Sequence, residues 1–145
     1  MSNDKKNLKI FIIDDEPSIV NLIFNLLKNF GYKAEFTTDA AKGLKIIQEK
    51  EFDVIFLDLC MPKESGLTIL KKIKAVYPLT QIIVITGYSS EFSLKACLKA
   101  GADEFICKPF DVDDLIKALE RCAERLETYK KIETLEKIVG DKLSK

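Results

Sequence analysis

The sequence predicts an α/β fold, in which a parallel sheet is covered by helices on both faces, and three observations support it. Four short apolar runs are nearly continuous and rich in branched or aromatic residues, which is typical of strands buried on both faces. Segments with the apolar spacing of helices separate these runs. The chain has 145 residues, 47% of them hydrophobic, which suits one domain with a substantial core.

Each expected element has a local signal. Pro17 is tolerated in the first turn of a helix, and Gly31 ends that helix. Thr38 or Asp39 can cap the second helix, and Asp111 can cap the fifth. The expected strands are 8–13, 32–37, 54–57, 82–85 and 105–107. The expected helices are 17–30, 40–50, 67–76, from Ser89 or Ser90 to Gly101, and from Asp111 onward.

The order of these elements predicts the topology. Consecutive parallel strands need crossover connections, and right-handed crossovers place helices on both faces of one sheet. The run 32–37 alternates and suits an edge strand. We therefore expect a flavodoxin-like, doubly wound (βα)5 three-layer sandwich with strand order 2-1-3-4-5 and an extended C-terminal helix.

The last helix continues past what one domain needs. Its apolar residues first step by four and three, as in a coiled-coil seam, and then continue with a change of phase. The seam is Leu115, Leu119, Cys122, Leu126 and Tyr129, followed by Ile132, Leu135 and Val139. Two interpretations stay open, a terminal helix that frays in solution and a dimerising or linker helix. We expect one domain over residues 1–125 and an extended helix or linker over 126–145.

Composition excludes several function classes. The formal net charge is zero, from 23 basic and 23 acidic residues, which argues against binding DNA or an anionic membrane through a basic face. No stretch approaches the roughly twenty apolar residues of a membrane span, and the polar start is unlike a signal peptide. The absence of histidine excludes Ser-His-Asp catalysis and His-ligated zinc. We expect a cytoplasmic protein.

The four cysteines do not have the spacing of a metal or redox motif. They are Cys60, Cys97, Cys107 and Cys122, without a C-x-x-C pair. Three lie inside apolar runs, which indicates small buried side chains in a reducing compartment.

Polar residues follow four of the expected strands. Asp14 and Asp15 come after the first, Asp58 after the third, Thr86 after the fourth and Lys108 after the fifth. The carboxyl edge of an open parallel sheet is where ligands bind. The three carboxylates repel one another, and the single ammonium offsets only one of their charges. A divalent cation would relieve the repulsion, and oxygen ligands favour Mg²⁺. Each residue alone is ordinary cap or turn chemistry, but their co-occurrence at four strand ends predicts a hard-cation site.

The segments 13–17, 57–62 with Gly66, 84–87 and 101–110 resemble the receiver domain of two-component response regulators in order and spacing. The resemblance covers about residues 8–125. It implies that Asp58 accepts a phosphoryl group from a sensor histidine kinase or a phosphotransfer protein. The Mg²⁺ ligands that it implies are Asp14, Asp15, Asp58 and the backbone carbonyl of Cys60.

The resemblance also implies a switch. Lys108 would pair with the phosphoryl oxygens, and Thr86 would bond to one of them in the active state. Phe105 would then rotate and repack the face of the fourth helix, fifth strand and fifth helix. This face would control a partner, homodimerisation on phosphorylation, or an output domain outside the chain. Such a protein catalyses only its own phosphorylation and dephosphorylation, and its Lys108–Pro109 bond is expected to be cis.

Three features depart from the family pattern or tune it. Phe105 stands where many relatives have tyrosine and offers no hydroxyl. Cys60 and Tyr88 each lie two residues beyond a site residue, and the bulk of Tyr88 suggests a long-lived phosphoryl group. No output domain follows within the chain.

Other functions would require different sequence features or share those of the switch. A phosphorelay intermediate uses the same site. A flavin or nucleotide binder on this fold needs a glycine-rich phosphate loop, and the sequence has neither common form of it. A metal-dependent phosphohydrolase with Asp58 as nucleophile needs a nearby acidic general acid, where Cys60 stands instead. A degenerate receiver that only binds proteins would lack some of the key residues, and all five are present.

Overall fold

The computed structural model describes residues 7–59, 65–87 and 91–143. Five parallel strands form one sheet in the order β2-β1-β3-β4-β5, as predicted. The elements are β1 (Ile10–Ile13), α1 (Pro17–Asn29), β2 (Ala34–Thr37), α2 (Ala40–Glu49), β3 (Val54–Asp58), α3 (Gly66–Val76), β4 (Gln81–Thr86), α4 (Glu91–Ala100), β5 (Glu104–Cys107) and α5 (Val112–Leu143).

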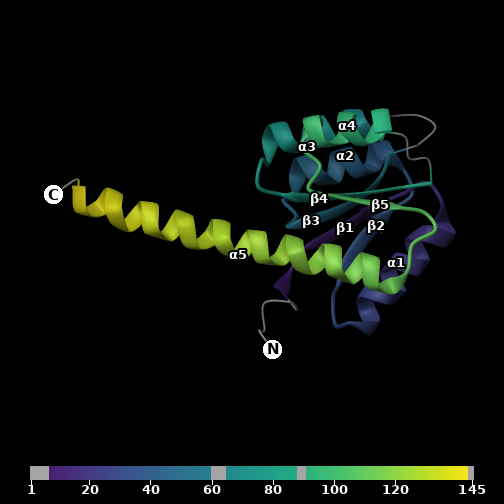
Figure 1. Cartoon of the computed structure of the whole chain (residues 1–145), viewed down its shortest axis with the longest axis horizontal. Coiled ribbons are helices and arrows are strands. Elements are labelled where there is room, and N and C mark those ends of the chain that lie inside the picture. The colour runs from purple at the N-terminus through teal and green to yellow at the C-terminus, as the bar shows by residue number, and fades with distance from the viewer. Residues whose placement is uncertain (1–6, 60–64, 88–90, 144–145) are drawn as a thin grey trace.

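Helices cover both faces of the sheet and complete three layers. Helices α1 and α5 lie on one face, and α2, α3 and α4 lie on the other (Figure 1). Alternate residues of β1 divide between the two cores, since Ile10 and Ile12 pack with α1 and α5, whereas Phe11 and Ile13 pack on the opposite side. The sheet is therefore buried on both faces, which explains its continuous apolar strands.

Local signals in the sequence have the expected structural roles. The Asp39 carboxylate accepts hydrogen bonds from the N–H groups of Ala41 and Lys42 at the start of α2. Asp111 and Asp114 cap α5 reciprocally, because each side chain accepts a hydrogen bond from the other's backbone N–H. The expected caps of α4, Ser89 and Ser90, lie outside the described residues.

The second strand begins later than the sequence suggested, at Ala34 rather than at Tyr32. The Tyr32 N–H donates to the carbonyl of Leu27 at 2.9 Å and so belongs to the end of α1. Gly31 makes this turn possible by adopting a φ of 87°. The Tyr32 side chain is buried in the core on the α1 and α5 side.

Cysteine burial follows the expectation in part. Cys97 and Cys122 are buried, and burial raises the pKa of the Cys122 thiol to about 12, which makes it a packing residue. Cys107 is exposed, so the prediction that it is buried is wrong. This cysteine is the last residue of β5, where the chain leaves the sheet. Cys60 lies outside the described residues.

The long helix α5 has two different parts. Leu115, Leu119, Cys122 and Leu126 are buried and pack against the sheet, so this part of the coiled-coil pattern is core and not a seam for a partner. Every residue from 130 to 143 is exposed, and this end of α5 extends far beyond the body (Figure 1). Within the described residues, no helix combines the length and apolar character that crossing a bilayer requires.

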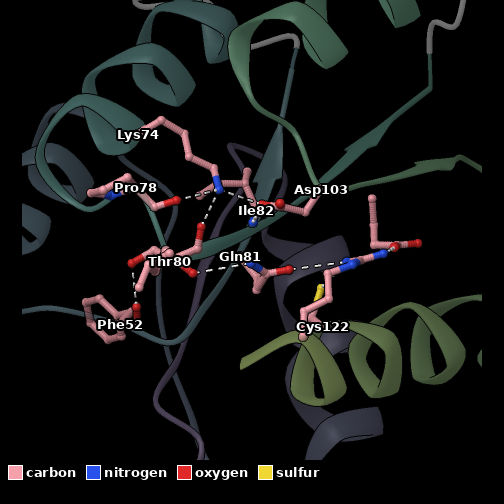
Figure 2. Close-up of polar contacts among 11 residues, drawn as sticks. Phe52, Lys74, Pro78, Thr80, Gln81, Ile82, Asp103 and Cys122 are labelled. Atoms are coloured by element: carbon pink, nitrogen blue, oxygen red, sulfur yellow. Dashed lines mark hydrogen bonds and ion pairs between the residues drawn. The ribbon is translucent and has the colours of Figure 1, made fainter. Parts of the chain in front are cut away.

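Polar side chains fasten α3 and α5 to the amino ends of the strands (Figure 2). The Lys74 ammonium lies 2.7 Å from the Thr80 carbonyl and 2.7 Å from Asp103 Oδ2. Arg125 donates to Gln81 Oε1 at 3.2 Å and also pairs with Glu104. These contacts all lie at the amino ends of the strands. The carboxyl ends lie at the opposite end of the sheet and take no part in them.

Candidate functional site

The predicted polar residues converge at the carboxyl edge of the sheet. Asp14 follows β1 directly and Asp58 ends β3, and the parallel pairing of Ile13 with Leu57 sets these two aspartates side by side. Asp14 is 2% and Asp58 3% exposed. The sheet thus places two buried carboxylates next to each other.

Asp15 and Glu16 enlarge this pair into an acidic cluster. One carboxylate oxygen from each of Asp14, Asp15, Glu16 and Asp58 lies within 4.8 Å of the others. Among the described residues, the buried Asp15 Oδ1 atom has no hydrogen-bond donor. A buried carboxylate oxygen without a donor is costly, and a cation would satisfy it. Oxygen-only ligands suit a hard divalent ion such as Mg²⁺, so the residues present fit the predicted metal.

Lys108 supplies the positive charge of the site. Its Nζ lies 3.0 Å from Asp14 Oδ2, 3.5 Å from Glu16 Oε1 and 3.8 Å from Asp58 Oδ2. Its backbone N–H donates to the Thr86 carbonyl at 2.8 Å, which holds the end of β5 against β4. The Lys108–Pro109 bond is cis, as expected.

The electrostatics of this site reflect competition between burial and pairing. Burial raises the pKa of Asp14, and the Glu16 N–H and Lys108 oppose that rise only in part. Burial acts to lower the pKa of Lys108, but its hydrogen bond to Asp14 and the surrounding carboxylates outweigh burial and raise it. Lys108 therefore stays protonated at neutral pH and remains a fixed counter-charge beside Asp58.

The turn after β3 is shaped by a close approach to Gly66. A Cβ atom on this residue would lie 2.4 Å from the carbonyl oxygen of Asp58 and 2.6 Å from the Cα of Leu59. The Gly66 N–H donates to the Leu59 carbonyl at 3.0 Å. The start of α3 thus packs directly on the backbone that carries Asp58, where only glycine fits.

The remaining predicted residues are partly described. Thr86 ends β4 and is fully buried, and Phe105 is half-buried against the core on the side of α2, α3 and α4. Cys60 and Tyr88 lie outside the described residues, so the carbonyl ligand and the shielding side chain stay predictions. Sequence reasoning did not count Glu16 among the cluster, although its position directly after two aspartates was a signal.

The family model and the related proteins that match this chain point to the same family. The sequence model of the family described as the response regulator receiver domain matches residues 10–120. The chain is 38% identical over 119 residues to a putative NtrX-like response regulator of Rickettsia typhi, covering 81% of this chain and 25% of that protein. It is 35% identical over 109 residues to the transcriptional regulatory protein DltR of Streptococcus agalactiae serotype III, covering 75% of this chain and 49% of that protein.

Solved structures agree in fold. A CheY-like receiver domain protein from Methanospirillum hungatei JF-1 superposes with a TM-score of 0.79 at 30% identity, covering 83% of this chain and 98% of that one. A receiver domain protein from Clostridium thermocellum gives 0.79 at 33% identity, with 84% and 98% covered. NtrX from Brucella abortus gives 0.82 at 28% identity, with 88% of this chain and 30% of that one covered.

These matches differ in extent. The receiver domain structures are covered almost entirely, whereas the chain spans between a quarter and a half of the curated relatives. The family match covers most of the chain and includes every described residue of the acidic cluster. The chain belongs to the response regulator receiver domain family, the phosphorylation-based signalling modules of two-component systems.

Proposed function

We propose that Asp58 is the phosphoryl acceptor of this receiver domain and that Asp14, Asp15 and Asp58 hold Mg²⁺ together with the backbone carbonyl of Cys60. The observation that carries the proposal is the position of Asp58. It is buried within an acidic cluster, and Lys108 Nζ lies 3.8 Å from its Oδ2 atom. A nucleophilic carboxylate beside a fixed cation is what phosphoryl transfer requires of a protein.

In the proposed reaction, a carboxylate oxygen of Asp58 attacks the phosphorus of a phosphohistidine on a kinase or phosphotransfer protein. The new O–P bond forms as the P–N bond breaks, and the histidine ring leaves with the electron pair of that bond. Lys108 neutralises charge on the phosphoryl oxygens. Mg²⁺ held by the acidic residues would supply further positive charge to the transferred group.

The same geometry supports a route for the signal. Thr86 would donate to a phosphoryl oxygen, and its movement would free space into which Phe105 rotates. The face formed by α4, β5 and α5 would then repack and control a partner, homodimerisation, or an output domain outside this chain. We propose that residues 1–125 form the receiver unit, that 126–145 form an extension, and that the protein acts in the cytoplasm.

Acetyl phosphate with Mg²⁺ tests the acceptor. We expect the parent chain to gain the mass of one phosphoryl group, and Asp58→Asn to gain none. Asp113→Asn, at an exposed aspartate in the first turn of α5, is the matched control and should be labelled like the parent. Equal labelling of Asp58→Asn and the parent would remove Asp58 from this role, and turnover of phosphomonoesters would favour a hydrolase.

A further inference from the structure

The outer segment of α5, residues 130–143, exposes an apolar stripe. Five large apolar side chains on it are between 45% and 82% exposed: Ile132, Leu135, Ile138, Val139 and Leu143. This segment extends away from the body (Figure 1). An isolated helix gains little from holding such side chains on one side in water, so a stripe of this kind indicates a docking surface.

The stripe is not a continuation of the face that packs on the sheet. At 3.6 residues a turn, Ile132 and Val139 lie in line with Arg125, which is seven residues before Ile132. The buried Leu126 lies about 100° around the helix from Arg125. The change of phase therefore occurs where α5 leaves the body, and it turns the outer apolar face toward a different neighbour.

We propose that the outer segment of α5 pairs with the same segment of a second copy of this chain, in parallel and in register, as a short two-stranded coiled coil. The stripe fits one heptad assignment, with Ile132 and Val139 at position a and Leu135 at position d. Branched residues at a with leucine at d favour two parallel strands. Among parallel coiled coils, these residue types thus indicate two helices and not three or four.

Charge complementarity supports the same arrangement. In a parallel pair each g residue faces the e residue five positions later on the other helix. Lys131 at g then faces Glu136 at e, and Ile138 at g faces Leu143 at e. An antiparallel pair would instead set g against g and e against e. With Leu135 opposite Ile132 of the other copy, Lys131 would meet Ile138 and Glu136 would meet Tyr129. With Leu135 opposite Val139, Glu136 would meet Glu136 of the other copy. Only the parallel pair matches charge with opposite charge and apolar with apolar.

The pairing is limited in length. Thr128 and Lys142 are the polar d positions on either side of Leu135. Closer to the body, the same side of α5 carries Arg121 and Arg125, which both bind Glu104. Two arginine pairs do not pack against each other as a and d residues do, so the helices separate there. We expect a weak, reversible dimer with both bodies at one end, independent of phosphorylation at Asp58.

Sedimentation equilibrium of the full chain over a range of concentrations tests the surface. The parent should shift from monomer toward dimer as concentration rises, and Leu135→Glu should raise the dissociation constant at least about tenfold. The matched control is Thr134→Glu, which adds the same charge one residue away on the side of the helix facing away from the seam. It should associate like the parent. A parent that stays monomeric at millimolar concentration, or equal association of Leu135→Glu and the parent, overturns the proposal.

Charge reversal tests the direction of pairing. Lys131→Glu and Glu136→Lys should each weaken the dimer, because each sets like charges opposite each other in the parallel pair. The double variant restores opposite charges and should recover the association of the parent. The two residues are five apart and do not face each other along one helix, so recovery reports contact between copies. A double variant as weak as the single ones rules out the parallel arrangement.

Discussion

At the scale of single residues, the site combines carboxylates that repel one another with one ammonium that offsets part of their charge. Asp14, Asp15, Glu16 and Asp58 bring four carboxylates together, and within the described residues Lys108 is the cation placed among them. The buried Asp15 Oδ1 atom has no donor among those residues. The cluster thus has the composition and spacing of a group that could hold a metal ion.

Asp15→Asn should separate these two demands. Removing one negative charge relieves repulsion within the cluster, so we expect the metal-free melting temperature to rise by about 3–6 °C. Millimolar Mg²⁺ should raise the melting temperature of the parent and leave that of the variant nearly unchanged. Thermal melts with and without Mg²⁺, with Asp113→Asn as control, measure both effects. A variant that still gains stability from Mg²⁺ would place the ion elsewhere.

Substitution by alanine should affect the stability of the protein differently at two glycines. Gly66→Ala puts a Cβ atom 2.4 Å from the Asp58 carbonyl oxygen, so we expect a loss of about 1–3 kcal/mol in the free energy of unfolding. Gly140 has open space around it and lies inside α5, so Gly140→Ala should be neutral or raise helix stability by up to about 1 kcal/mol. Urea unfolding and circular dichroism compare them. Equal responses would contradict the tight packing assigned to Gly66.

At the scale of elements, one carboxylate of β5 forms ion pairs with two arginines of α5. Glu104 receives hydrogen bonds from both Arg121 and Arg125. Burial acts to raise the pKa of Glu104, but the two arginines outweigh burial and lower it. A lowered pKa in the folded state means that this contact contributes stability above the ordinary glutamate value of 4.5 and loses it as pH falls through the folded pKa.

Glu104→Gln should therefore change the pH dependence of stability. We expect the variant to be less stable than the parent at neutral pH, because both arginines lose a charged partner. The difference should shrink as pH falls from the ordinary glutamate pKa through the lower pKa of Glu104 in the folded state, where the parent also loses the charge. Urea unfolding from neutral to acidic pH measures it, with the exposed Glu127→Gln as control. A difference that stays constant with pH would indicate lost packing and not lost charge.

Strand ends were predictable because the apolar runs stop where the polar site begins. Sequence periodicity located Asp14, Asp58 and Lys108 at one edge, and parallel pairing brings the carboxylates together. Contacts across the chain were not predictable in the same way. The crowding at Gly66 depends on how α3 returns to β3, and the exposure of Cys107 depends on where β5 emerges.

The heptad pattern of α5 carried a different ambiguity. Spacing by four and three fits a seam between two chains and also fits a helix packed on its own sheet. The fold decides between them for the inner part of the helix, since Leu115, Leu119 and Leu126 belong to the core. In the sequence, the change of phase before Ile132 is what separates the buried stripe of α5 from the exposed one. The spacing alone does not show which of the two stripes packs in the core.

At the scale of the whole molecule, the signalling body and the projecting helix are energetically separate. Core contacts of α5 reach Leu126, and all residues from 130 onward are exposed. Ending the chain after Lys130 should therefore change the free energy of unfolding by no more than about 1 kcal/mol and leave phosphorylation intact. The shortened chain should lose self-association. Urea unfolding and mass spectrometry after acetyl phosphate treatment check the first two results, and a shortened chain that fails to accept a phosphoryl group would tie the extension to the site.

The most direct measurement of the central claim locates the phosphoryl group itself. Borohydride reduces an acyl phosphate of aspartate to homoserine, which peptide mass spectrometry assigns to one position. After treatment with acetyl phosphate and Mg²⁺, we predict homoserine at position 58 and at no other aspartate. Homoserine at Asp14 or Asp15, or a chain that yields none while Mg²⁺ is bound, would contradict the assignment of Asp58 as the acceptor.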